Sequence, residues 1–525
     1  MKLLTSEELI AAGYEPGPVF KDLFAKIAEY EERGIKDKKY ALKLLKRDIA
    51  PPPPKVVMRE KAVGFTEAIL PEGKEEKANV AMVRKKMDEL LKAPVIARGA
   101  IMPDACPAGP SNAVIPVGGA IAVENAIIPS AHSADICCSM FATFYEERST
   151  VAKELDALTS STRFGPGHRH LDDLVHDPVL DEDVWSNRFL YGMKDRAHAH
   201  LADQGDGNHF AYLGEVEVTP QMLAVLRLTG HAELAGKLEG AGRSSHGLER
   251  DAPATVPTTL RVLVTHHGSR SLGAHVYKCG QALALKHVTR KGRHIPPAAA
   301  WLDAESPEGK DYWDALQYVA RWTKANHRAV HRRFIERIGG EAVADFGNEH
   351  NFVWQRGDMF FHGKGATPAW KDSDGRPQLG LIPLNMAEPI LMVLGADQDE
   401  FLSFAPHGAG RNLSRTALRK QFPDEAARRH AIEKGTDGID VRWFCGQPDL
   451  SETPVAYKNA DAVKAQIDHF GLAEVVAEIR PLGCIMAGDV PKPWLREKEL
   501  TPKQKRQIEH RKERRKTRQE LNDEF

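Results

Sequence analysis

The sequence has few cysteines, no long apolar run and almost no net charge. Its six cysteines are scattered over 525 residues, which argues against a disulfide framework and favours reduced thiols, with one or two available as metal ligands. The most apolar segment, residues 381–395, is interrupted by Pro383, Asn385 and Glu388, so it is not expected to span a bilayer. Because the net charge is −1, a polyanionic partner would be bound by local basic patches.

The N-terminal residues show no apolar core with a small-residue cleavage site, so the sequence predicts a cytoplasmic protein without a membrane partner. With 42% hydrophobic and 28% charged residues, the composition is typical of a globular chain. The 22 histidines are many for this length, and they suit metal binding or proton transfer.

The chain is expected to divide into four segments. Thr5 and Glu8 have the spacing of a capping box, which indicates a helix at the start. A run of four prolines begins at Pro51 and predicts a stiff linker. The predicted segments are a small helical unit at 1–50, a proline-rich linker at 51–55, a large domain at 56–490, and a basic helical tail at 491–525.

The large domain mixes strand and helix patterns without a regular βαβ alternation, which favours an α+β fold over a doubly wound sheet. Buried strands are predicted at 113–123, with a glycine bend, and at 259–264, ending at His266. An amphipathic helix is predicted at 310–338, and a hairpin at 351–361.

The tail is strongly basic: residues 496–518 contain eleven Lys or Arg against four Glu. A helix that binds RNA through its phosphates would have this composition. A solvated helix crossed by ion pairs would have it too, and the sequence leaves both interpretations open.

The segment 406–415 has the composition of a phosphate-binding loop. His407 is followed by Gly-Ala-Gly, which leaves its ring uncrowded and lets the backbone approach a ligand closely. Arg411, Ser414 and Arg415 follow, and a guanidinium group matches phosphate oxygens in a bidentate way. An imidazole beside a bound phosphate can act as an acid, a base or a nucleophile. The alternative is a glycine-rich turn that opens a helix.

A mixed set of metal-ligand residues is found elsewhere in the chain. Asp135 and Cys138 are one helical turn apart, so their side chains can converge on one ion or bridge two. His209, His266 and His350 each lie in a polar turn rich in glycine or asparagine, and not on an apolar helix face. Any one of them alone is typical of a structural residue, whereas their shared context favours a mixed Asp, Cys and His metal site.

In their order along the chain, these motifs resemble the RtcB family of RNA ligases over roughly residues 90–488. The resemblance implies an RtcB-like mixed-sheet core. It is carried by Met102-Pro103-Asp104, Ile115-Pro116-Val117-Gly118-Gly119-Ala120, Asp135-Ile136-Cys137-Cys138-Ser139-Met140, Gly207-Asn208-His209-Phe210, His266-His267-Gly268-Ser269-Arg270, His350-Asn351, His362-Gly363-Lys364-Gly365-Ala366-Thr367, His407-Gly408-Ala409-Gly410-Arg411 and Tyr457-Lys458.

The resemblance implies a site with two manganese ions and a GTP-dependent reaction. Cys138 would bridge the ions, and Asp135, His209, His266 and His350 would complete their ligands. His407 would attack the α-phosphate of GTP and form a histidine–GMP intermediate. The nucleotide would then pass to an RNA 3′-phosphate, and a 5′-hydroxyl would displace GMP. The expected nucleotide-binding residues are Asn208, Asn351, Asn385, Arg411, Ser414, Arg415 and Tyr457.

Several positions depart from the family pattern. Met486 stands where a lysine that contacts guanine is usual, and Tyr212 stands where a glutamate is usual. A glycine-rich phosphate loop is replaced at 384–387, His267 replaces a serine, and Cys106 replaces a histidine. The sequence therefore predicts a divergent member, with intact metal and nucleophile positions and altered positions around the base.

The substrate expected from the resemblance is RNA with 3′-phosphate or 2′,3′-cyclic phosphate and 5′-hydroxyl ends, in RNA repair or tRNA splicing. Two other functions stay open: a metal-dependent RNA phosphoesterase that activates water, and a non-catalytic RNA-binding factor suggested by the basic tail. The sequence does not specify the RNA, an accessory protein or the oligomeric state.

Overall fold

A computed structural model describes residues 3–14, 16–51, 56–109, 111–245, 258–291, 295–413 and 415–489. The predicted linker at 51–55 and the predicted tail at 491–525 lie almost entirely outside these ranges, so the division into four segments stays a prediction. Among the described residues, no helix combines the length and the apolar character needed to cross a membrane.

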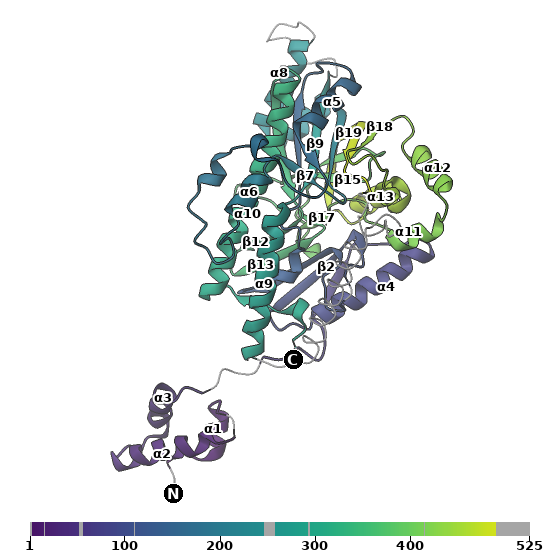
Figure 1. The fold of residues 1–525 in the computed structure, drawn as a ribbon. Helices are drawn as coiled ribbons and strands as arrows, with labels where there is room; N and C mark the ends of the chain where they lie inside the picture. The colour runs from purple at the N-terminus through teal and green to yellow at the C-terminus, as the bar shows by residue number, and fades with distance from the viewer. Residues whose placement is uncertain are drawn as a thin grey trace, which may run out of the picture.

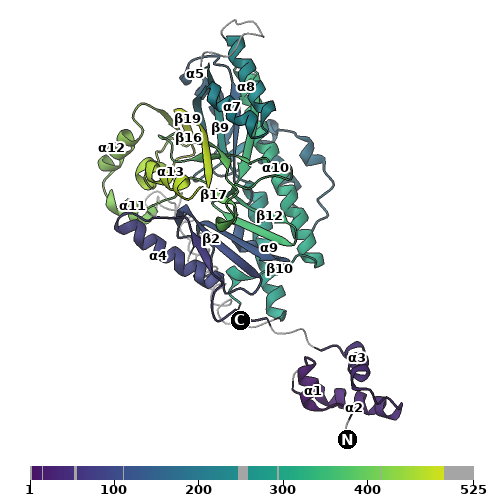
Figure 2. The ribbon, with the colours of Figure 1, turned by 180° about the vertical axis from the view of Figure 1, so that it is seen from behind.

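The first segment consists of three helices, α1 (Ser6–Ala11), α2 (Val19–Glu32) and α3 (Lys38–Asp48). The capping box is confirmed, because Thr5 accepts from the backbone of Glu8 and the Glu8 side chain accepts from the backbone of Thr5. Leu23, Ile27 and Leu45 contribute to a core within this segment. Both ribbon views show α1–α3 apart from the body of the molecule (Figure 1, Figure 2).

Two sheets dominate the remaining chain. An eight-stranded sheet has the order β11 (Ala342–Glu349), β5 (Ser139–Tyr145), β9 (Thr258–His267), β8 (Phe210–Val218), β19 (Ala473–Met486), β16 (Ile390–Gly395) and β15 (Leu379–Pro383), with β18 (Asp440–Trp443) pairing with β19. A five-stranded sheet has the order β1 (Phe65–Glu67), β2 (Ile96–Cys106), β3 (Val117–Glu124), β13 (Met359–Lys364) and β12 (Asn351–Arg356).

Three short strand pairs complete the β-structure: β14 (Ala366–Pro368) with β17 (Phe404–Pro406), β10 (Leu302–Asp303) with β4 (Ala126–Ile127), and β6 (Arg163–Phe164) with β7 (Asp203–Gly205). The helices of this part are α4 (Gly73–Leu90), α5 (Val151–Ser161), α6 (Lys194–Ala199), α7 (Pro220–Leu228), α8 (Ala232–Ser245), α9 (Arg270–Lys291), α10 (Pro307–Arg337), α11 (Arg415–Gln421), α12 (Glu425–Gly435) and α13 (Ala460–His469). The fold is therefore mixed α+β, as predicted.

The eight-stranded sheet curves until its outer strands meet. Leu381 of β15 donates its backbone N–H to the side chain of Asn348 in β11 at 2.8 Å. Side chains alternate between the two faces of each strand. On β9, Val262 and Val264 contribute to the core on the inner face, whereas Leu263 packs with Phe334 of α10 on the outer face.

The predicted elements outside the site match the observed ones with one correction. The hairpin is confirmed by the antiparallel pairing of β12 and β13, and Gly357 at its turn has a φ of +62°. The long helix is confirmed, with Tyr312 and Trp322 buried. The strand predicted from residue 113 begins only at Val117, next to a bend at Gly118 with a φ of +70°.

Candidate functional site

The predicted ligands gather at one end of the eight-stranded sheet. β5 and β8 both run antiparallel to β9, which lies between them, and β11 runs antiparallel to β5. The first residues of β5 and β8 therefore lie beside the last residues of β9 and β11. This arrangement brings together Cys138, His209, His266 and His350, which come from distant parts of the sequence.

Asp135 and Cys138 lie in an irregular turn before β5, and the helical spacing suggested by the sequence is wrong. Cys137 has a φ of +56°, and the Cys138 N–H donates to the Asp135 carbonyl at 3.2 Å. A hydrogen bond from Ser269 Oγ to the Ile136 carbonyl, 2.6 Å long, holds the turn against the end of β9. A Cβ on Gly268 would lie 2.0 Å from Asp135 Oδ1, so the close approach requires glycine.

One group of potential metal ligands consists of Asp135, Cys138 and His209, whose ligand atoms lie within 4.8 Å of one another. His209 Nδ1 lies 3.0 Å from the Gln204 carbonyl, which can only accept, so Nδ1 carries the proton and Nε2 carries the lone pair. His209 Nε2 lies 2.8 Å from Asp135 Oδ2. A lone pair facing a carboxylate at this distance needs a proton or a cation between the two atoms.

A second group consists of Cys138, His266 and His350, again within 4.8 Å of one another. His266 Nδ1 contacts the Asn208 carbonyl at 3.1 Å, which leaves the lone pair on Nε2. This Nε2 lies 3.1 Å from both Cys138 Sγ and His350 Nε2. The two groups share one sulfur atom, so the arrangement can hold two ions with Cys138 between them.

Electrostatics of the site fit bound cations. Burial disfavours the charged form of Asp135, but the charge and hydrogen bond of His209 prevail and lower the pKa of Asp135 to about 2. Burial lowers the pKa of His266 to about 3, so its imidazole is neutral and able to bind a metal. Burial and Asp135 raise the pKa of Cys138 well above its usual value, which disfavours a thiolate without a neighbouring cation.

His407 follows β17 and is held by a carboxylate that was not predicted as a site residue. Asp104 Oδ2 lies 2.5 Å from His407 Nδ1 and also accepts from the His407 backbone N–H at 3.3 Å. Because a carboxylate accepts, Nδ1 carries the proton and Nε2 carries the lone pair. The ring of His407 lies 4.9 Å from that of His350, between centroids. The predicted nucleophile, the acid that orients it and the potential metal ligands therefore lie close together.

The chain packs closely around Asp104. Gly410, with a φ of +74°, could not carry a Cβ, which would lie 2.1 Å from the Asp104 carbonyl oxygen. Asp104 is itself fully buried in β2. The available signal in the sequence was an acidic residue within a mostly apolar segment. Such a segment is expected to be buried, and acids are rarely buried without a partner.

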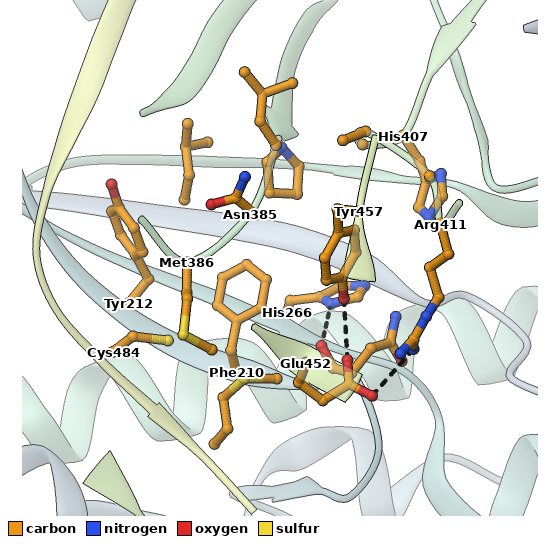
Figure 3. A pocket seen from close by; sticks show the side chains of 18 of the residues that line it. Phe210, Tyr212, His266, Asn385, Met386, His407, Arg411, Glu452, Tyr457 and Cys484 are labelled. Atoms are coloured by element: carbon orange, nitrogen blue, oxygen red, sulfur yellow. Dashed lines mark hydrogen bonds and ion pairs between the residues drawn. The ribbon is translucent and has the colours of Figure 1, made fainter. Parts of the chain in front are cut away.

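Arg411 lies at the side of the cavity and is paired within the protein. Its guanidinium donates to Glu452 Oε1 at 3.2 Å and to the Ser451 carbonyl, and it lies over the ring of Tyr457. The Tyr457 hydroxyl donates to Glu452 Oε2 at 3.0 Å. Figure 3 shows the three side chains together. Glu452 is a second site residue that the sequence motifs did not indicate.

A cavity of about 200 Å³ adjoins part of this site. Its lining includes His266 and His407 together with the predicted nucleotide-binding residues Asn208, Asn385, Arg411 and Tyr457. Asn351 does not contribute to the lining; its Oδ1 accepts from the Gly365 backbone at 2.8 Å and supports the loop beside His407. Ser414 lies outside the described residues, and Arg415, the last residue of the segment predicted to bind phosphate, begins α11.

Comparison with known proteins gives a family for this arrangement. The family model described as tRNA-splicing ligase RtcB matches residues 184–487, more than half of the chain. This chain belongs to the RtcB family. The match includes His209, His266, His350 and His407. The matched region begins at residue 184, whereas the resemblance seen in the sequence motifs begins near residue 90. Asp104, Asp135 and Cys138 lie before the matched region, so only the geometry of the structure links them to the site.

Curated relatives support the same assignment at low identity. The chain is similar to a tRNA-splicing ligase RtcB of Pyrococcus abyssi, 28% identical over 58% of this chain and 32% of the relative. It is 25% identical to that of Aeropyrum pernix over 57% of this chain and 62% of the relative. A relative from Pyrobaculum aerophilum is 26% identical over 70% of this chain and 84% of its own length. The chain thus spans about a third to three fifths of the first two RtcB relatives.

Proposed function

We propose that this RtcB family member is a metal-dependent RNA ligase that joins 3′-phosphate or 2′,3′-cyclic phosphate ends to 5′-hydroxyl ends. A nucleotide attached to His407 would activate the RNA end. Membership of the family supports RNA as the substrate, and the names of its relatives, tRNA-splicing ligases, favour a role in tRNA splicing. The observation that carries the proposal is His407, held by Asp104 beside two groups of metal ligands.

The resemblance to the RtcB family implies two Mn²⁺ ions. The Asp135 carboxylate suits this ion, and the sulfur shared by the two groups could contact both ions. Asp135, Cys138 and His209 would hold one ion, and Cys138, His266 and His350 the other. Bound at these residues, the ions would withdraw charge from the phosphates of the nucleotide and compensate the charge of the departing pyrophosphate.

The protein's own residues then account for nucleotide transfer. Asp104 keeps the proton of His407 on Nδ1 and leaves the lone pair of Nε2 for attack. A bond forms between Nε2 and the α-phosphorus of GTP, the bond from that phosphorus to the bridging oxygen breaks, and pyrophosphate leaves. The Asp104 carboxylate stabilises the positive charge that the imidazole acquires.

The following two steps transfer the nucleotide to RNA and seal the strand. An oxygen of the RNA 3′-phosphate attacks the same phosphorus, and the bond to Nε2 breaks, which restores His407. The 5′-hydroxyl of the second RNA end then attacks the 3′-phosphate, and GMP leaves. A cyclic phosphate end would first be opened by water. Asn208, at the cavity wall, is suited to bind phosphate or ribose oxygens.

Covalent labelling tests the proposal. The protein is incubated with Mn²⁺ and GTP labelled at the α-phosphate, and the label is followed on the denatured protein. We expect an acid-labile, alkali-stable label on the wild-type protein and none on the His407→Ala variant. The His469→Ala variant is a matched control, because His469 lies in α13 and does not line the cavity. A label that persists on His407→Ala would refute the nucleophile.

A ligation assay separates this function from phosphate-ester hydrolysis. RNA with a 3′-phosphate and RNA with a 5′-hydroxyl should be joined only when the nucleotide and Mn²⁺ are both present. Release of inorganic phosphate from the 3′-end without consumption of nucleotide would identify a phosphoesterase instead.

A further inference from the structure

The cavity beside His407 has two chemically different ends. Around His407 the walls carry ionisable groups, among them His266 and Arg411. Figure 3 shows Tyr212, Met386 and Cys484 on the side away from His407. A ligand with its phosphate at His407 would extend its other end toward these residues.

This far end is lined by sulfur atoms and aromatic rings. Met386, Cys484 and Met486 form a buried cluster, and Phe210 packs against it. These four residues make up the sulfur-lined end of the cavity. In the register of β19 and β8, Cys484 lies opposite Tyr212 and Met486 lies opposite Phe210. Burial raises the pKa of Cys484 to about 12, so this thiol is uncharged at neutral pH.

The polar side chains near the sulfur-lined end do not distinguish the two purines. The Tyr212 hydroxyl donates to the Ile479 carbonyl at 2.9 Å, and Tyr212 is only 1% exposed. Asn385 Oδ1 accepts from the Ala387 N–H at 2.9 Å, so its amide group is left to donate to an acceptor such as N3 or N7, which guanine and adenine both carry. Glu452 is the one carboxylate among the lining residues, and it is bonded to Arg411 and Tyr457.

The hydrogen-bonding groups that line the cavity determine whether it can distinguish guanine from adenine. Guanine presents a ring N–H and an amino group that need an acceptor, whereas adenine presents an acceptor at the same ring position. A site that hydrogen-bonds one of these edges rejects the other base by about 10⁴-fold or more, but an apolar pocket discriminates by only about 10- to 200-fold. Sulfur and aromatic side chains attract the face of either purine.

We infer that the sulfur-lined end is the base subsite, and that it holds a purine by shape and dispersion without reading its hydrogen-bonding edge. His407 therefore accepts a nucleotide from ATP as well as from GTP. The inference rests on the proposed attack by His407 on a nucleotide, and it assigns Met386 and Met486 as residues that set the base preference.

Single-turnover labelling with each triphosphate tests the selectivity. The wild-type protein with Mn²⁺ is mixed with α-labelled ATP or GTP over a range of concentrations, and the rate constant of labelling is divided by the apparent Kd. We expect the GTP and ATP values to differ by less than about 200-fold. A larger ratio would overturn the inference, because it would require a group that reads the base edge.

Filling the sulfur-lined end tests its location. The Met486→Trp variant should raise the apparent Kd for ATP and GTP alike by at least about tenfold, because the ring would occupy the space of the base. Leu228→Trp is the matched control, since Leu228 is 87% exposed on α7. Unchanged values for Met486→Trp would overturn the assignment. Met386→Trp, in the loop between β15 and β16, replaces it if Met486→Trp fails to fold.

The two proposals fail in different ways. If no triphosphate labels the wild-type protein, or if His407→Ala is labelled equally, the proposed function fails. If His407 is labelled from GTP and not from ATP, the proposed function stands and the base subsite inference fails. Equal labelling by CTP and UTP would also overturn the inference, because a purine-shaped subsite would hold the smaller pyrimidines less well.

Discussion

His266 and His267 are neighbours in the sequence, and both are buried, yet they lie on opposite faces of β9. His266 points toward Cys138 and His350 at the end of the sheet. His267 stacks on His327 of α10, with 3.5 Å between ring centroids. Because successive side chains of a strand alternate between faces, a shift of one residue would exchange their environments.

Hydrogen-bond partners distinguish the two groups of histidines. His209 and His266 each use Nδ1 on a backbone carbonyl and direct Nε2 at other ligand atoms. On the α10 side, His331 contacts Thr143 and Thr265 hydroxyls at 2.7 Å through its two nitrogens. His327 contacts the hydroxyls of Thr265 at 2.6 Å and Ser139 at 3.0 Å.

The comparison shows that burial of an imidazole does not identify a metal ligand. Burial lowers the pKa of His331 to about 3, as it does for His266, so both rings are neutral. His327 and His331 have both ring nitrogens beside hydroxyl groups, whereas Nε2 of His209 and of His266 faces a sulfur, a carboxylate or another imidazole. Potential ligand atoms that face one another favour a cation between them, and variants in each group can test this distinction.

The largest expected effect on metal binding is that of His266→Ala. If His266 is a ligand of the proposed centre, its removal should lower the affinity for Mn²⁺ by more than about 100-fold, since the loss of a supporting partner alone costs about 10- to 100-fold. Isothermal titration calorimetry with MnCl₂ would measure this. The His331→Leu variant should bind Mn²⁺ as tightly as the wild type. An equal loss of Mn²⁺ affinity in both variants would contradict the distinction between the two groups of histidines.

Asp104→Asn should slow nucleotide transfer by about 1,000-fold, within the usual contribution of a positioned acid–base group. The amide can present N–H toward Nδ1 and favour the tautomer without a lone pair on Nε2. Single-turnover labelling measures the rate, and Mn²⁺ affinity should be unchanged. Asp399→Asn serves as the control, because its side chain is 85% exposed. Loss of Mn²⁺ binding in Asp104→Asn would contradict a positioning role.

His331→Leu should lower the free energy of unfolding by about 2 kcal/mol, since an unsatisfied buried polar group costs about 1–3 kcal/mol. The substitution removes the His331 partner of the Thr143 hydroxyl, whereas the Thr265 hydroxyl keeps its contact with His327. Urea denaturation monitored by tryptophan fluorescence would measure the change. Unaltered stability together with weaker Mn²⁺ binding would indicate that His331 contributes to the metal site.

Thr143→Val should have the smallest effect, about 1 kcal/mol of unfolding free energy, because it removes one hydrogen bond to His331 and leaves the bond to Thr265. Thr289→Val, at an exposed position of α9, is the matched control and should change stability by less than about 0.5 kcal/mol. A larger loss in the control would show that the hydroxyl at position 143 has no special role.

Local patterns anticipated much of this fold but not its contacts. The strand ending in His266, the helix containing Trp322 and the hairpin at Gly357 follow from periodicity and turn chemistry. The pairing of Asp104 with His407 spans 303 positions, and no local pattern encodes it. The helical turn predicted at Asp135 and Cys138 is wrong because a spacing of three residues occurs in irregular turns as well as in helices.

The sequence by itself determined which chemical groups are available: an imidazole in a glycine loop, a set of Asp, Cys and His side chains, and sulfur-bearing residues near the end of β19. Only the tertiary structure decided which of them meet. Strand register placed His266 among the potential metal ligands and His267 against α10. The same register placed Met486 opposite Phe210 and not among charged groups. Register depends on long-range pairing and burial of a whole face, which no single segment specifies.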